Sequence, residues 1–231
     1  VVILGYFVWN VAGQTGWFDN LGIFSSHAAG NAYYSGTEYL EQEQYNQAIV
    51  DFDEAIRLDP EYANAYYTRG IAHRNLGQHE QAIVDFDEYI RLDPGDASAY
   101  FNRAYSYDEL GQHQLAIRDL DEYIRLDPQS GSAYYNRGRA YSKRGLYEQA
   151  ILDFDEYIKL EPYDTDAYFN RAYAYDELGQ YQRAIDDLDE AIRLDPQSGS
   201  AYYNRGRAYN YLGQQEIADL DFAKAKSLGV E

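Results

Sequence analysis

Residues 97–128 read ASAYFNRAYSYDELGQHQLAIRDLDEYIRLDP, and this stretch decides the fold. In its first half, Tyr100, Ala104 and Tyr107 recur at i, i+4 and i+7, which is the spacing of one face of an α-helix. Gly111 follows this segment, and glycine ends helices because it takes the left-handed conformation at little cost. The first half therefore predicts one helix that ends just before Gly111.

The second half carries a similar apolar stripe at Ala116, Leu120 and Tyr123, which predicts a second helix over residues 114–126. Pro128 ends that segment, because proline cannot continue a helix. One such stretch is therefore expected to fold as helix, tight turn, helix, turn.

The same phrase recurs along the chain with a fixed period. All the prolines end a version of AIRLDP and recur at a constant spacing of 34, at Pro60, Pro94, Pro128, Pro162 and Pro196. Residues 129–141 and 197–209 are both QSGSAYYNRGRAY, which adds a double period of 68 and indicates that a pair of repeats was duplicated. A repeat length of 34 residues is typical of repeat architectures.

Small and large side chains alternate at matching places in every period. Small residues lie in the first helix at Gly36, Gly70, Ala104, Gly138, Ala172 and Gly206, and in the second helix at Ala48, Ala82, Ala116, Ala150, Ala184 and Ala218. Large apolar residues follow four positions later at Phe52, Phe86, Leu120, Phe154, Leu188 and Phe222. Turn glycines recur at Gly77, Gly111, Gly145, Gly179 and Gly213.

With the prolines, this pattern resembles the tetratricopeptide repeat (TPR) family over residues 29–231. The repeats would span 29–62, 63–96, 97–130, 131–164, 165–198 and 199–231. The resemblance implies an all-α, right-handed superhelical solenoid of antiparallel helix hairpins. Its first helices would line an open concave groove, and an apolar N-terminal extension would precede it.

The chain departs from the family pattern at three kinds of position. The first helix of repeats two to six carries an arginine where the family usually has leucine, at Arg69, Arg103, Arg137, Arg171 and Arg205. We expect their stems to pack in the hairpin and their heads to reach an acidic residue of a second helix. Tyrosine replaces the usual small residue late in the second helix at Tyr89, Tyr123 and Tyr157, and Glu43 replaces the turn glycine of the first repeat.

Helical spacing predicts which side chains line the groove. The inner ladder would be Tyr33, Tyr67, Phe101, Tyr135, Phe169 and Tyr203, flanked by Asn102, Asn136, Asn170 and Asn204. The asparagines can donate to and accept from an extended backbone. Further along the helices, repeats three and five would present Tyr105 with Asp108 and Tyr173 with Asp176, whereas repeats four and six would present Arg139 and Arg207. Tyrosine at helical spacing is also common in cores, so some of these rings could be structural.

The N-terminal segment 1–28, VVILGYFVWNVAGQTGWFDNLGIFSSHA, lies outside the repeat register and contains one charged residue, Asp19. Three interpretations remain open: a membrane anchor, a cap on the apolar end of the first repeat, or an assembly segment inserted into another copy. The assembly segment would act through Val1, Ile3, Tyr6, Phe7, Trp9, Trp17, Phe18 and Phe24. There is no methionine, even at position 1, so we expect a processed or trimmed chain.

Composition excludes several functions. The formal charge of −20 argues against a nucleic-acid partner, and the lack of cysteine excludes disulfides and zinc–thiolate sites. The four histidines show no ligand spacing, GQTG at 13–16 lacks the lysine of a phosphate loop, and the DxDE phrases are expected to form a solvated convex face. We therefore expect no enzyme activity, no cofactor and no metal.

The sequence predicts a protein–protein interaction scaffold that binds polypeptide in an aromatic groove. We expect copies to assemble head to tail through the N-terminal segment, since an apolar tail and an uncapped last repeat could protect each other. The alternative is a monomeric adaptor, anchored in a cell envelope, that binds a foreign peptide or a glycan. An extracellular or envelope location is favoured over a cytoplasmic one.

Overall fold

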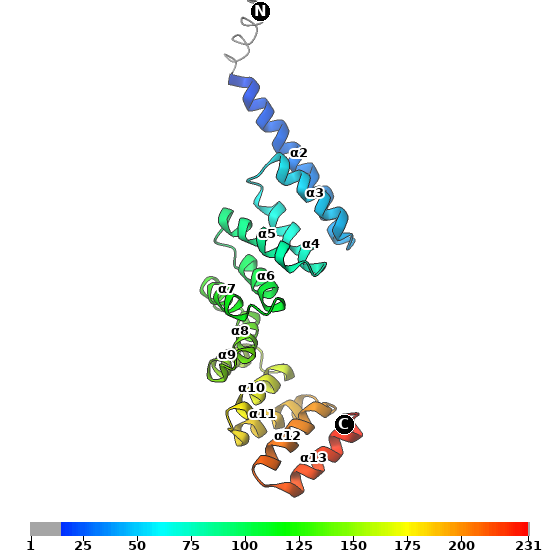
Figure 1. The fold of residues 1–231 in the computed structure, drawn as a ribbon, viewed down its shortest axis with the longest axis vertical. Coiled ribbons are helices and arrows are strands. Elements are labelled where there is room, and N and C mark those ends of the chain that lie inside the picture. Colours follow the sequence, from blue (N-terminus) through cyan, green and yellow to red (C-terminus); the bar gives the residue numbers. More distant parts are fainter. Residues whose placement is uncertain (1–14, 231) are drawn as a thin grey trace, which may run out of the picture. The chain divides into compact units, whose positions relative to one another are not determined.

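The computed structural model describes residues 15–230, and describes side chains from Ser26 onward. These residues form helices and no strand (Figure 1). The helices are α2 (Thr15–Glu41), α3 (Tyr45–Leu58), α4 (Ala63–Asn75), α5 (His79–Leu92), α6 (Ala97–Glu109), α7 (His113–Leu126), α8 (Gly131–Lys143), α9 (Tyr147–Leu160), α10 (Thr165–Glu177), α11 (Tyr181–Leu194), α12 (Gly199–Tyr211) and α13 (Gln215–Ser227). The expected all-α solenoid of helix hairpins is confirmed. Two compact units divide at Ser106 and Tyr107.

The turn inside each hairpin requires a left-handed residue. Gly77 has a φ of 73°, and the amide of Gln78 donates back to the carbonyl of His73 at 2.9 Å, which closes the end of α4. The glycines of the later repeats adopt the same conformation, as the sequence predicts. Glu43 takes this place in the first repeat with a φ of 58°, so a residue with a Cβ is held in a conformation that favours glycine.

In four of the hairpins, a glycine of the first helix meets a phenylalanine of the second. A Cβ built on Gly138 would lie 2.8 Å from the Phe154 ring, which is closer than carbon atoms pack. The same contact joins Gly70 to Phe86. In the fifth repeat, Ala172 packs with the smaller side chain of Leu188 instead. The size of one partner therefore compensates for the size of the other.

Helix α2 is longer than the other first helices. It has 27 residues, whereas α4 has 13 and begins at Ala63, which is the counterpart of Ala29 in the repeat frame. Residues 15–28 therefore continue the first helix of repeat one upstream of that frame. The division at 28 and 29 stays a prediction, and the side chains of the proposed assembly segment lie outside the described ones.

Membrane insertion was one interpretation of the N-terminal segment. In the described part of the chain, no helix has both the length and the apolar character needed to cross a bilayer.

Candidate functional site

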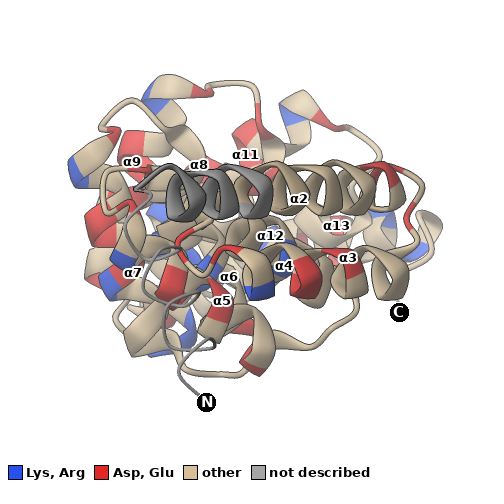
Figure 2. Cartoon of the chain, turned by 90° about the horizontal axis from the view of Figure 1, so that it is seen from above, with Lys and Arg blue, Asp and Glu red and all other residues tan. Residues whose placement is uncertain are grey.

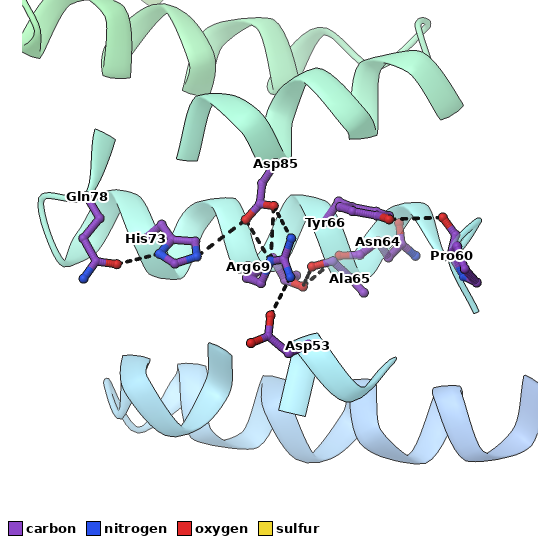
Figure 3. A network of polar contacts seen from close by, with 10 residues as sticks. Asp53, Pro60, Asn64, Ala65, Tyr66, Arg69, His73, Gln78 and Asp85 are labelled. Carbon is purple, nitrogen blue, oxygen red and sulfur yellow. Dashed lines mark hydrogen bonds and ion pairs between the residues drawn. The ribbon is translucent and has the colours of Figure 1, made fainter. Parts of the chain in front are cut away.

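The arginines of the first helices join neighbouring repeats. Arg69 on α4 donates to Asp85 on α5, through Nη2 at 2.5 Å and Nε at 3.0 Å, and through Nη1 at 2.5 Å to Asp53 on α3 (Figure 3). One guanidinium thus binds a carboxylate of its own hairpin and one of the preceding hairpin. We call this arrangement the arginine clasp. The expectation that the arginine heads reach a second-helix acid is confirmed.

The clasp recurs with little variation. Its arginines are Arg137 with Asp153 and Asp121, Arg171 with Asp187 and Asp155, and Arg205 with Asp221 and Asp189. The hydrogen bond to Asp221 raises the pKa of the Arg205 guanidinium above its ordinary value. The guanidinium group is planar and its N–H bonds have fixed directions, which suits contact with two carboxylates. The ammonium group of a lysine could not reproduce this arrangement.

The clasp corrects the interpretation of the DxDE phrases. From the second repeat on, their first aspartate is buried, as in Asp85 at 2% exposure, and their second aspartate, as in Asp53, holds the arginine of the next repeat. The second aspartate and the glutamate stay on the surface, since the Asp53 side chain is 56% exposed and Glu54 pairs with Arg57 one turn later. A solvated convex face was therefore the wrong expectation only for the first of the three acids. The constant spacing between each arginine and its two aspartates was the signal in the sequence.

The first helices of repeats two to five each carry two adjacent aromatic residues near their start, YY or YF, and the first tyrosine of each pair has a structural role. The hydroxyl of Tyr66 donates to the carbonyl of Pro60 at 3.3 Å, and its ring lies 5.6 Å from the Arg69 guanidinium. Tyr168 repeats both contacts with Pro162 and Arg171, at 3.1 and 5.8 Å. These tyrosines tie the turn before the helix to the clasp.

The second residue of each pair forms the predicted ladder, and the structure half-buries most of it. Tyr67 packs on Phe86 and Tyr89 with ring centres 5.9 and 4.9 Å apart, and burial raises its pKa. Tyr135 packs in the same way on its own hairpin, whereas Tyr203 is 37% exposed. The ladder therefore contributes edges and hydroxyls to the surface more than whole ring faces.

The flanking asparagines are partly used inside the protein. Each donates from its side-chain amide to the backbone carbonyl four residues earlier, as Asn170 does to Asp166 at 2.7 Å. Asn170 also donates to the Tyr135 hydroxyl at 3.1 Å. Phe169, the ladder residue before Asn204, has no hydroxyl that could accept such a bond. Asn204 therefore keeps more donor capacity for a ligand than Asn170 does.

The next rung is the most exposed part of the predicted site. Tyr105 and Tyr173 are each 45% exposed. The Arg74 guanidinium lies 5.5 Å from the Tyr105 ring, and Arg139 lies 5.8 Å from Tyr135. These aromatic faces with adjacent cations are suited to holding a chain that offers apolar and acidic groups.

Sequence reasoning did not single out Asp108 and Asp176 as site residues, although it placed them on this surface. Lys143 and His113 both contact Asp108, at 2.7 and 2.8 Å. Asp176 lies in a pocket with Phe169, Ala172, Tyr173, Leu188 and Asn204. Burial raises the pKa of Asp176.

Charge is unevenly distributed along the helices. In the part of α2 whose side chains are described, residues 26–41, the charged residues are Glu38 and Glu41, whereas α3, α5 and α11 show acidic residues at short intervals (Figure 2). Many of these carboxylates are occupied by the clasps. The net charge of −20 nevertheless leaves an acidic molecule that favours basic partners.

Comparison with known families agrees with this geometry. Family models described as tetratricopeptide repeat match residues 63–96, 101–167, 165–198 and 188–219, and one described as TPR repeat matches 36–77. The chain belongs to the tetratricopeptide repeat family. TPR hairpins are protein-interaction modules. This TPR chain is accordingly a protein–protein interaction scaffold.

Solved TPR structures superpose over most of the chain. A crystal structure of MamA protein is 27% identical, with a TM-score of 0.70 over 73% of this chain and 92% of that one. MamA from Desulfovibrio magneticus RS-1 is 23% identical, with a TM-score of 0.70 over 72% of this chain and 94% of that one. YrrB, described as a TPR protein with an unusual peptide-binding site, is 23% identical, with a TM-score of 0.69 over 77% and 92%. No curated protein sequence matches the chain significantly.

Proposed function

We propose that this TPR chain is a non-enzymatic scaffold that binds a polypeptide on the surface of its first helices. The observation that carries the proposal is the exposure of Tyr105 and Tyr173. Other tyrosines of the first helices, such as Tyr66 and Tyr168, are instead engaged by a turn carbonyl and a clasp arginine. Tyrosines offer a large contact area at low entropic cost, which suits peptide recognition. YrrB shows that a fold of this kind can carry a peptide-binding site.

The test selects peptides from a displayed random library on the full chain and measures the affinity of the strongest binder. Tyr105→Ala and Tyr173→Ala are made separately, and at least one of them should weaken binding by about tenfold or more, because aromatic anchors dominate peptide interfaces. Tyr163→Ala is the matched control, because Tyr163 is 79% exposed but lies in the turn before α10. Effects of both variants no larger than that of the control would refute these tyrosines as binding residues. A glycan that binds to the same tyrosines, with no peptide selected, would replace the proposal.

Association between copies is a second candidate, and one observation favours it. The last hairpin exposes four large apolar residues, Tyr211, Leu212, Ile217 and Leu220, at 59, 40, 44 and 72%. Such a patch marks a contact surface in many proteins. The clasp, however, does not extend past this hairpin, because Ala223 stands where Asp189 serves the repeat before it. A second copy stacked there would therefore lack the second aspartate of a clasp.

The head-to-tail arrangement through residues 1–28 stays a prediction. Light scattering and negative-stain microscopy on the full chain and on a chain lacking residues 1–28 distinguish the candidates. Oligomers or fibres that disappear on deletion would support assembly through that segment. Monomers in both samples would leave the scaffold proposal standing alone, and polymers that survive the deletion would exclude the segment as the cause.

A further inference from the structure

The duplicated pair of repeats creates two equivalent carboxylates. Asp108 lies in YSYDELGQ at 105–112, and Asp176 lies in YAYDELGQ at 173–180, one double period later. Both aspartates occupy the last turn of a first helix and are only partly exposed, at 21% and 16% of the side chain. The hairpin that holds each aspartate is followed by the same thirteen residues, QSGSAYYNRGRAY, at 129–141 and 197–209. Differences between the two sites therefore come from a few neighbouring positions.

The protein itself fills the site at Asp108. Lys143 on α8 places its Nζ 2.7 Å from Oδ2, and His113 on α7 places its Nδ1 2.8 Å from Oδ1. Both carboxylate oxygens are thus engaged by nitrogen donors, one of them an ammonium group from the following repeat. This site shows how a lysine side chain fits beside the carboxylate.

Asp176 has neither of these partners. The equivalent positions, one double period after Lys143 and His113, are Tyr211 and Tyr181, whose rings stack on each other at 4.7 Å. Oδ1 of Asp176 is buried without a hydrogen-bond partner. Oδ2 has one long contact, 3.4 Å from Nη2 of Arg207. A buried carboxylate oxygen without a donor costs free energy, and a bound donor would recover it.

The surroundings of Asp176 form a pocket of a definite chemical kind. Phe169, Ala172 and Leu188 supply apolar walls, and beside them lies the Tyr173 ring, which packs edge-on against Tyr147 with ring centres 6.1 Å apart. Asn204 at the edge donates one amide N–H to the Ser200 carbonyl. Asn170 donates to a tyrosine hydroxyl as well, and Asn204 has no such tyrosine beside it. Apolar walls with one carboxylate suit an aliphatic chain that ends in a single cation.

We propose that the Asp176 pocket binds a lysine side chain of a polypeptide partner, with its ammonium beside the Asp176 carboxylate as that of Lys143 lies beside the Asp108 carboxylate. The proposal rests on the polypeptide-binding function proposed above and names the side chain recognised there. Lysine is favoured over arginine because Arg207 already lies beside Oδ2. A guanidinium fork, which pairs with both oxygens, would meet that positive charge.

The test uses nuclear magnetic resonance titration of the full chain with three blocked tripeptides, Gly-Lys-Gly, Gly-norleucine-Gly and Gly-Arg-Gly. We expect the lysine probe to shift the Asp176 carboxyl and Tyr173 ring signals, and the other two probes to bind at least fivefold more weakly. Asp176→Asn should reduce lysine affinity about tenfold. Glu177→Gln removes the same charge from the exposed neighbouring residue and should change it less than twofold.

A second variant fills the pocket from within. Tyr211→Lys combined with Tyr181→His reproduces the Asp108 arrangement and should abolish lysine binding while the chain keeps its helical circular dichroism. Equal binding of the norleucine probe, equal losses in Asp176→Asn and Glu177→Gln, or undiminished binding in the filled variant would each overturn the proposal. A library-selected peptide that needs Tyr173 but binds Asp176→Asn normally would refute the lysine pocket and leave the scaffold function intact.

Discussion

At the scale of single residues, each clasp arginine joins an aromatic ring and two carboxylates of neighbouring helices. Arg171 is 18% exposed, stacks on Tyr168 and bonds to Asp187 and Asp155. Removing one member of such a set leaves a buried charge without compensation, which costs more than the interaction itself contributes. The acidic composition is therefore partly structural.

Arg171→Lys tests this role. Lysine keeps the charge but cannot bridge two carboxylates through a rigid fork, so we expect the free energy of unfolding to fall by about 1–3 kcal/mol. Urea denaturation measures the change. Arg193→Lys is the control, because Arg193 forms an exposed pair with Glu190 and should change stability by less than about 0.5 kcal/mol. Equal losses of unfolding free energy in the two variants would mean that bridging two carboxylates by Arg171 does not stabilise the chain.

A second residue-scale prediction concerns Glu43, which holds the left-handed turn position that glycine fills in later repeats. Glu43→Gly removes the strain of the Cβ, although it adds chain entropy to the unfolded state. We expect a net stabilisation of about 0.5–1 kcal/mol, read as a higher urea midpoint. The opposite change, Gly77→Ala, should destabilise the chain. A lower midpoint for Glu43→Gly would show that the glutamate side chain has contacts that outweigh the strain.

At the scale of helices, hairpin geometry depends on matched side-chain volumes. The glycine of α8 allows the large ring of Phe154 to reach the helix backbone, whereas Ala172 and Leu188 fill the same volume differently. Close packing makes either partner intolerant of a change made alone.

Gly138→Ala should therefore destabilise the chain by about 1–3 kcal/mol, because the new methyl group meets the Phe154 ring. Combining it with Phe154→Leu recreates the pair found in the fifth repeat and should restore at least half of the loss. A double-mutant cycle in urea measures the coupling energy. Simple additivity of the two changes would contradict a shared volume.

At the scale of the whole molecule, tyrosine burial makes stability depend on alkaline pH. Burial and a hydrogen bond with Tyr173 raise the pKa of Tyr147 to about 12, and burial also raises the pKa values of Tyr67 and Tyr135. A raised folded-state pKa means that the native chain keeps protons that the unfolded chain releases. Its stabilising contribution is complete below pH 10, the ordinary tyrosine value, and is lost as pH rises above that value.

We expect the urea midpoint to fall steadily between pH 10 and 12, in step with the appearance of tyrosinate absorbance in the near ultraviolet. Tyr147→Phe should reduce the fall, since phenylalanine has no proton to lose. A midpoint that stays constant over this range would show that tyrosine ionisation is not coupled to folding.

The sequence by itself determined the hairpins, their turns and the family, because these depend on local patterns that recur in every repeat. It also predicted that the clasp arginines reach a second-helix acid. The tertiary structure decided which acids pair with which arginine, since Asp85 and Asp53 meet Arg69 only when three helices pack together. It likewise decided that both oxygens of Asp108 have nitrogen partners, whereas Oδ1 of Asp176 has none. That difference depends on which side chain of the following repeat reaches the carboxylate, and spacing along one helix does not determine it.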